Sequence, residues 1–199
     1  MGIIKAIGAL TLFVVLGLVG FWAYLGGFSS VVFEEQPYGP VEIAYTTHLG
    51  SYAKISESWN RFETEWNDAG IDGKRCDSLA VYLNSPDETE PENLQSILAC
   101  RLDTALAEDA ENFRKAFPVF TIPQVSALRT EFPFKNFLSF MVGPMKVYPA
   151  AEKRMKQDAL EASIAIELYG PGEKPDRIGI VIPVDHDKSE FDALREAFE

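Results

Sequence analysis

Hydrophobic residues follow three patterns along this chain: one unbroken run, several short alternating stretches and one stripe at helical spacing. The unbroken run extends from Ala6 to Leu25 and contains no charged residue. A helix of about 20 residues rises about 30 Å, which matches the hydrocarbon core of a bilayer. Trp22 and Tyr24 stand near the end of the run, where aromatic rings favour the headgroup boundary. The pattern therefore predicts that residues 6–25 cross a membrane as a single helix.

A cleaved signal peptide is the alternative interpretation of this run. Lys5 would supply its basic segment, but the run exceeds the usual limit of about 15 residues and no clear small-residue cleavage site follows. For a membrane helix, Lys5 favours an N-terminus on the cytoplasmic side, because the next basic residue is Lys54. The folded part would then be periplasmic or extracellular, and a cytosolic location remains the alternative.

The residues after the run predict a boundary. Residues 26–30 are rich in Gly and Ser, which is typical of a short flexible exit from the membrane. We therefore assign residues 1–28 to the membrane anchor and residues 29–40 to a linker. Residues 41–184 form the predicted folded domain, and residues 185–199 form a predicted tail helix.

Strand-like and helix-like patterns alternate in the first half of the domain. Alternating and β-branched residues predict strands at 41–47, 78–83 and 94–103. Between the first two, apolar residues recur at spacings of four, three and four, at Ile55, Trp59, Phe62 and Trp66. This stripe predicts an amphipathic helix that packs against a sheet.

The same order of elements recurs after Pro118. The second set comprises a strand at 125–130, a long helix within 134–160, and a hairpin at 164–169 and 179–185. The two hairpins align so that Tyr82 falls on Glu167 and Pro86 falls on Pro171.

We interpret residues 41–103 and 123–184 as two copies of one β-α-β-β unit. They predict an α+β domain with pseudo-twofold symmetry, in which an antiparallel sheet carries two long helices on one side and a cleft lies between the halves. Pro144 and Pro149 fall inside the second helix. Because proline removes a backbone donor and clashes with the preceding turn, we expect a kink or a break near Gly143.

Composition narrows the classes of function. The chain has 199 residues, of which 47% are hydrophobic, enough for a full core and too many for a disordered chain. It carries 18 Lys and Arg against 30 Asp and Glu, a formal net charge of −12. This deficit of basic residues argues against a nucleic-acid partner and against a polybasic patch on anionic lipid.

The sequence gives little support for a metal site or for a nucleophilic active site. Two Cys and two His residues allow at most one zinc site of the four-ligand kind unless carboxylates take part. No P-loop, dinucleotide fingerprint or Ser-His-Asp signature is present. We predict no cofactor, no metal site and no assigned catalytic residue. Cys76 and Cys100 would lie close in the first hairpin, and the sequence leaves a disulfide and free thiols as alternatives.

Two separated motifs carry a resemblance to a known family. The first is H-x-G-x-Y at residues 48–52, just before the predicted helix, and the second combines E-x-Y at 167–169 with I-P-V at 182–184. Residues 41–184 resemble the GyrI-like small-molecule-binding domain, a superfamily that includes SOUL and effector-binding domains. The resemblance implies that Glu167 lies at the base of an aromatic pocket that attracts cationic or polar ligands.

A closer resemblance is to membrane-anchored members of the testis-expressed protein 264 type. The stretches VEIAYTTHLGSY, SLAVYLNSP and TEFPFKNFLSFMVGPMKVYPA carry it. Members of this type serve as autophagy receptors of the endoplasmic reticulum, through a short aromatic-x-x-aliphatic motif. FDAL at residues 191–194 fits that motif, so an ER-phagy receptor or adaptor is one alternative function.

Glu167 is the central candidate of the site. Strand alternation sends Ile166 to one face of the sheet and Glu167 to the other, and the alignment places Tyr82 opposite this glutamate. A carboxylate among aromatic rings has a raised pKa and attracts a cation. The plain alternative is a solvated glutamate on an open sheet face.

Further candidates for ligand binding are the tyrosines that keep a polar end and one tryptophan. They are Tyr52, Tyr82, Tyr148, Tyr169 and Trp59. The plain alternative is that stripes of aromatic residues pack in the core. His48 stands at a strand-to-helix turn, where a structural hydrogen bond is a better expectation than catalysis or haem ligation.

We expect a single-pass membrane-anchored protein that captures a small apolar or cationic molecule, or a partner peptide, in an aromatic cleft above Glu167. Its bilayer contact would be residues 6–25. The second alternative is a hydrolase of reactive small molecules that uses Glu167 as an acid or base. Glu131 is the candidate for the second carboxylate that such chemistry would favour.

Overall fold

An eight-stranded antiparallel sheet forms the centre of the computed structural model, which describes residues 2–71, 76–169 and 176–199. The strands are β1 (Glu34–Tyr38), β2 (Val41–Leu49), β3 (Ser78–Tyr82), β4 (Gln95–Arg101), β5 (Val119–Ile122), β6 (Val125–Pro133), β7 (Ala165–Tyr169) and β8 (Arg177–Pro183). Their order across the sheet is β1-β6-β8-β7-β3-β4-β2-β5, and each neighbouring pair is antiparallel.

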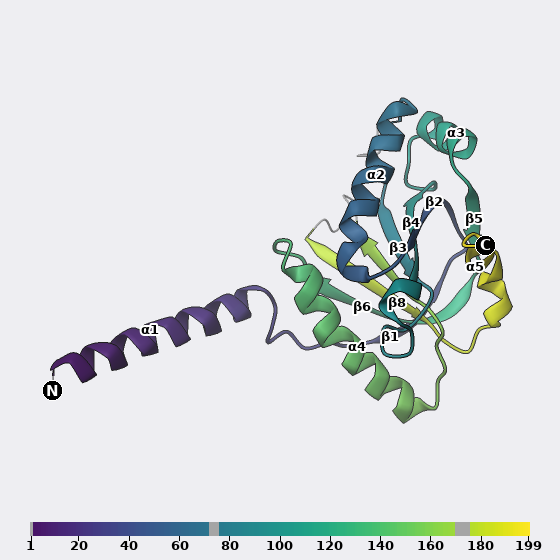
Figure 1. The fold of residues 1–199 in the computed structure, drawn as a ribbon. Coiled ribbons are helices and arrows are strands. Elements are labelled where there is room, and N and C mark those ends of the chain that lie inside the picture. Colours follow the sequence, from purple (N-terminus) through teal and green to yellow (C-terminus); the bar gives the residue numbers. More distant parts are fainter. Residues whose placement is uncertain (1, 72–75, 170–175) are drawn as a thin grey trace.

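The element order β-α-β-β occurs twice (Figure 1). The first set is β2, α2 (Ile55–Asp68), β3 and β4, and the second is β6, α4 (Ser139–Asp158), β7 and β8. A shorter helix, α3 (Ala107–Ala116), connects the two sets. The α+β class with an antiparallel sheet and two long helices is therefore confirmed.

The halves join through β3 and β7 at the middle of the sheet. There Val81 pairs with Ile166, Tyr82 with Ala165, and Ala80 with Glu167. The two residues that the sequence alignment equates, Tyr82 and Glu167, are thus each paired with an alanine of the other strand. Pro171, which the alignment places on Pro86, lies outside the described residues.

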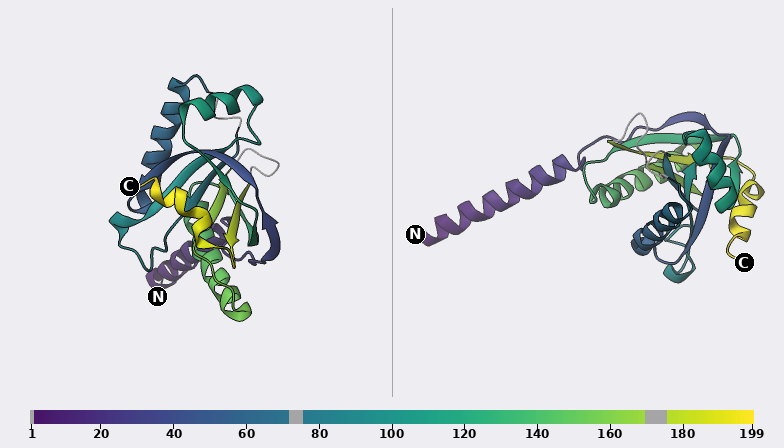
Figure 2. Two further views of the ribbon diagram at one scale, coloured as in Figure 1. Left: turned by 90° about the vertical axis from the view of Figure 1, so that its right-hand side faces the viewer. Right: turned by 90° about the horizontal axis from the view of Figure 1, so that it is seen from above.

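Each face of the sheet packs against its own set of helices. One face buries Ile43, Leu79 and Ile166 together with the C-terminal segment, which includes α5 (Asp192–Glu196). The other face has two clusters, one under α2 and α3 and one under α4. Figure 2 shows α2 and α4 along one side of the sheet and α5 at the end of the domain away from α1 (Gly2–Tyr24). Both long helices thus lie on one side, as the pattern predicts.

The segment 29–40, expected to be a linker, contains strand β1, which pairs with β6 at the sheet edge. Its sequence, EEQPY, has one buried side chain, that of Tyr38. A segment with so little hydrophobic alternation gives no strand signal, and its pairing depends on the neighbouring strand. Pro37 is tolerated because an edge strand has a free side where its missing donor is not needed.

Helix α4 runs without a break through Pro144 and Pro149. Of the kink or break expected near Gly143, the break is therefore absent from this described helix, and the kink stays a prediction. Its buried residues, including Val142 and Val147, pack on the cluster under α4 and hold the two halves of the helix on the sheet. Gly143 allows the close approach: a Cβ there would stand 3.2 Å from a ring carbon of Phe132.

Helix α1 is long and apolar enough to cross a membrane from Ile4 to Tyr24, and a signal sequence would satisfy the same measure of length and composition. Figure 1 shows it projecting from the domain. Residues at its exit, which the sequence predicts to be flexible, contact the domain. Leu25 is 3% exposed, and Lys146 Nζ donates a 2.7 Å hydrogen bond to the Gly27 carbonyl. The end of α1 is therefore packed against the domain.

The C-terminal segment and the cysteines also contribute to the core. The predicted tail helix appears as a 3-10 turn, Lys188–Phe191, followed by α5. Phe191 and Leu194 are fully buried. A disulfide joins Cys76 to Cys100, with their Cα atoms 5.8 Å apart, which selects one of the two alternatives left open by the sequence.

Candidate functional site

The carboxyl group of Glu167 lies in the middle of the sheet, on the face covered by α2 and α4. The side chain is 5% exposed, so the solvated alternative does not describe it. Its neighbours Ile166 and Leu168 pack in the cluster on the opposite face. The predicted alternation along β7 is therefore confirmed.

Three tyrosine hydroxyl groups donate hydrogen bonds to this carboxylate. Tyr148 donates to Oε1 over 2.8 Å, while Tyr169 and Tyr82 both approach Oε2, the latter over 3.5 Å. The hydroxyl groups of Tyr82 and Tyr169 also lie 3.0 Å apart. Both carboxylate oxygens thus have donors, which compensates for part of the burial of a charged group.

The donors come from three separate elements. Tyr82 ends β3, Tyr169 ends β7, and Tyr148 projects from the middle of α4. Because Ala80 pairs with Glu167, Tyr82 stands two residues away along the same face of the adjacent strand. The site therefore depends on the pairing of β3 with β7 and on the position of α4 above them.

Aromatic rings surround the tyrosines. Tyr52 meets Tyr82 edge-on at 4.8 Å between ring centroids, and its hydroxyl donates to the Asn84 carbonyl over 2.9 Å. Trp59 meets Tyr169 edge-on at 6.3 Å. All six residues assigned to ligand binding from the sequence are thus in one continuous cluster, and their role in binding stays a prediction.

Phe140 is a neighbour of the site that sequence reasoning did not assign to it. Its ring lies 5.4 Å from that of Tyr169, nearly perpendicular to it, and 38% of the residue is exposed. It stands eight positions before Tyr148 on α4, about two helical turns away. That spacing was the available signal, but it does not distinguish a site residue from a core residue.

Burial dominates the electrostatics of the cluster. Desolvation raises the pKa of Glu167 above its usual value, and the hydrogen bonds from the three tyrosines oppose that rise. Burial, followed by the nearby glutamate charge, raises the pKa of Tyr82, Tyr148 and Tyr169 well above the usual value. The tyrosines are therefore neutral donors near pH 7, and among the described residues no basic group contributes to the pKa of Glu167.

The other residues considered from the sequence lie elsewhere. His48 is buried and structural: its Nδ1 is 2.8 Å from Ser58 Oγ and its Nε2 is 3.2 Å from the Ser51 carbonyl. Glu131 is exposed to solvent, unlike Glu167. Within residues 2–71, 76–169 and 176–199, no group of three His, Cys, Asp or Glu side chains is arranged to hold a metal ion.

Comparison with known proteins rests on structure. No family model matches the sequence, and no curated protein matches it. Among solved structures, the C-terminal domain of EcmrR matches with a TM-score of 0.55 and 8% identity, over 79% of this chain and 99% of that one. SAV2435 bound to tetraphenylphosphonium matches with a TM-score of 0.50 and 14% identity, over 77% of this chain and 94% of that one.

The fold is consistent with a GyrI-like domain. EcmrR in a complex with DNA also matches, with a TM-score of 0.54 and 8% identity, over 87% of this chain and 65% of that one. At these identities the matches show the fold. The resemblance to the testis-expressed protein 264 type rests on the sequence stretches alone.

Proposed function

We propose that this chain is a single-pass membrane-anchored protein that binds a small lipophilic cation at the aromatic cluster around Glu167. The observation that carries the proposal is a buried carboxylate held by three neutral donors, with no basic group among the described residues that affect it. Burying an ion without a counter-ion is unfavourable by several kcal/mol even after relaxation. A cationic ligand would supply the positive charge that Glu167 lacks.

The chemistry of the surrounding side chains favours an organic cation over a small hydrated one. The rings of Trp59 and Phe140 both meet the ring of Tyr169 edge-on. Such a group of aromatic rings suits an apolar ligand that carries a diffuse positive charge. SAV2435, which has a similar fold, was solved with tetraphenylphosphonium, a cation of this class.

Binding would require the tyrosines to move. Their hydroxyl groups donate hydrogen bonds to both oxygens of Glu167. A ligand that reaches the carboxylate must displace at least one of these hydrogen bonds, each worth about 1.5–3 kcal/mol to a charged group. The half-buried rings of Tyr52 and Trp59 and the more exposed ring of Phe140 form the outer side of the cluster, where a ligand would enter.

Two alternatives are less favoured. A hydrolase of the expected kind would use a second carboxylate near Glu167, but Glu131, the candidate, is exposed. An adaptor that docks through FDAL would need Phe191 and Leu194 on the surface, and both are fully buried in the core.

Calorimetric titration of the full chain in nanodiscs with tetraphenylphosphonium tests the proposal. We expect Glu167→Gln to weaken binding at least about tenfold, the equivalent of about 1.4 kcal/mol, since the substitution removes the only charge that the proposal uses. Glu63→Gln is the matched control, because it removes an exposed carboxylate on α2 and should leave the affinity unchanged.

The opposite charge provides a second control. Tetraphenylborate has nearly the same shape as tetraphenylphosphonium and carries the opposite charge, so only a signal specific to the cation counts. Equal affinity of the wild type and Glu167→Gln for the cation would refute the assignment of the site.

A further inference from the structure

A strongly apolar and exposed surface covers the first half of α4 and the turn before it. Phe137 is 68% exposed, Met141 is 57% exposed and Met145 is 65% exposed. Exposed side chains of this size gathered on one surface normally mark a contact with a partner or a membrane.

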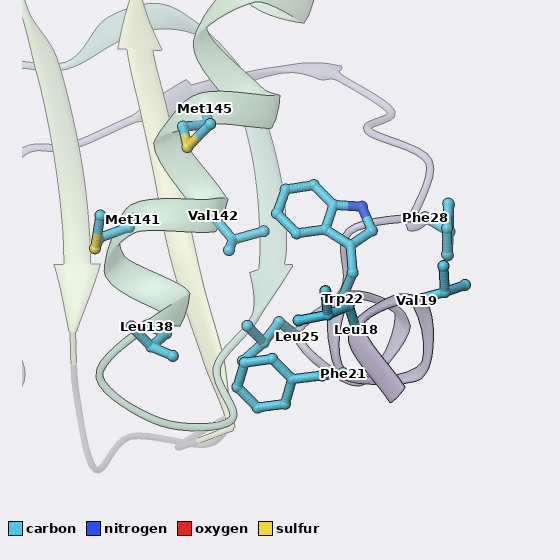
Figure 3. Close-up of a pocket in the computed structure, with 10 residues that line it drawn as sticks. All are labelled: Leu18, Val19, Phe21, Trp22, Leu25, Phe28, Leu138, Met141, Val142 and Met145. Atoms are coloured by element: carbon cyan, nitrogen blue, oxygen red, sulfur yellow. The ribbon is translucent and has the colours of Figure 1, made fainter. Parts of the chain in front are cut away.

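The surface continues onto α1 through an open apolar groove of about 500 Å³. Its α4 side includes Leu138, Met141 and Met145, and its α1 side includes Leu18, Phe21 and Trp22. Figure 3 shows Phe21 and Trp22 reaching from α1 toward the side chains of α4.

The position of the groove along α1 determines how deep it would lie in a membrane that α1 crosses. Leu18 precedes the end of α1 at Tyr24 by about 9 Å, at a rise of 1.5 Å per residue. The groove that Leu18 shares with Leu138 therefore does not stop at the end of α1. It lies beside part of the apolar segment that is expected to cross the membrane. Any medium that surrounds this part of α1 also surrounds the facing part of α4.

Contacts at residues 25–27 hold the domain against the end of α1. Leu25 is buried in the cluster under α4, and Gly26 is so close to Pro133 that an added Cβ would stand 2.7 Å from its Cγ. Lys146 holds the Gly27 carbonyl from α4. These contacts leave no slack segment by which the domain would lift away from the end of α1.

The charge of residues 132–151 also fits a position at the membrane surface. Residues 132–151 contain two lysines, Lys135 and Lys146, and no acidic residue, although the whole chain has a net charge of −12. Lysines beside apolar residues suit the headgroup layer, where the ammonium group reaches water or phosphate and the stem stays in the apolar zone.

We propose that the first half of α4, with the turn before it, is inserted in the interfacial layer of the bilayer that α1 crosses. The proposal rests on the membrane anchor of the proposed function. The occupant of the groove is then lipid, because the groove is continuous with the helix that lipid already covers. Phe140 belongs to this part of α4 and touches Tyr169, so the outer wall of the Glu167 cluster faces the membrane surface.

Depth-dependent fluorescence quenching tests the proposal on the full chain in nanodiscs. The native cysteines are joined in a disulfide, so a new cysteine at Met141 accepts a single nitrobenzoxadiazole label. We expect this label to be blue-shifted, quenched by nitroxide-bearing lipids and protected from aqueous iodide. A label at Glu108→Cys, at the exposed start of α3, should behave in the opposite way.

A third label, Leu12→Cys in the middle of α1, separates the two proposals. If it is quenched by lipid while the Met141→Cys label is quenched by iodide, the anchor stands and membrane insertion of α4 is refuted. If iodide also reaches the label at Leu12→Cys, α1 is not a membrane anchor. The membrane-anchored protein of the proposed function and the insertion of α4 are then both refuted. A Met141→Cys label protected from both quenchers would show coverage by protein, such as a second copy, and would also overturn the proposal.

Discussion

The hydrogen bond from Tyr148 to Glu167 gives the sharpest test of the electrostatic argument. Tyr148→Phe removes one hydroxyl group and leaves the ring in place, so no large cavity forms. The bond that disappears is 2.8 Å long and ends on a carboxylate that is 5% exposed. We expect a loss of stability that depends on whether Glu167 is ionised.

The magnitude follows from the charge of the acceptor. A hydrogen bond to a charged group contributes about 1.5–3 kcal/mol, and a neutral one contributes about 0.5–1.5 kcal/mol. Since the bond lowers the pKa of Glu167, its removal raises that pKa further in the folded protein. The variant should therefore be less stable than the wild type by about 2 kcal/mol when Glu167 is ionised, and by about 1 kcal/mol when it is protonated.

Urea unfolding of the full chain in detergent micelles measures this difference across the pH range. Tyr38→Phe is the matched control. The Tyr38 hydroxyl is buried and has no hydrogen-bond partner among the described residues, so its removal should be neutral or slightly stabilising at every pH. Burial raises the pKa of Tyr38 to about 12, so its own ionisation does not interfere near neutral pH.

Two results would refute the reasoning. A loss for Tyr148→Phe that stays constant with pH would mean that the ionisation of Glu167 is not coupled to this bond. Equal effects of Tyr148→Phe and Tyr38→Phe would mean that the bond itself contributes nothing.

Three further predictions concern the charge, the disulfide and the end of α1. Because burial raises the pKa of Glu167 in the folded protein above its usual value, wild-type stability relative to Glu167→Gln should fall as pH rises through that pKa. A pH-independent difference in urea unfolding would contradict the burial. Titration of unreduced protein should find no free thiol, and reduction of the Cys76–Cys100 bond, which spans 24 residues, should lower stability by about 3 kcal/mol; two reactive thiols would exclude the bridge. Gly26→Ala, at a φ of 85°, should lower the thermal midpoint by an amount worth at least about 1 kcal/mol, while Gly20→Ala, with no neighbour within 4 Å, should not; equal effects would mean that the end of α1 is not packed on the domain.

Local patterns account for the elements that the sequence predicts well. The apolar run of α1, the stripe at Ile55 and Phe62, and the alternation in β7 all reflect the period of a single helix or strand. Each is a property of consecutive residues, so it can be read without knowing the partners. The face of Glu167 follows from the same rule.

Elements with weak patterns depended on their neighbours. Strand β1 contains EEQPY and β5 has four residues, so neither has enough alternation to be recognised alone. Both are edge strands, and each forms because β6 or β2 offers it hydrogen bonds. The packing of Leu25 likewise depends on residues more than 100 positions away, such as Val142.

The sequence by itself determined that a helix able to cross a membrane precedes an α+β domain, and that a glutamate shares a sheet face with aromatic residues. The tertiary structure alone decided that Tyr82, Tyr148 and Tyr169 meet at Glu167, that Phe191 is buried, and that α4 lies beside the end of α1. The reason is physical: periodicity specifies the direction of a side chain, whereas its contacts depend on strand register and helix placement. Tyr82 and Glu167 are 85 residues apart in the chain, and no local rule brings them together.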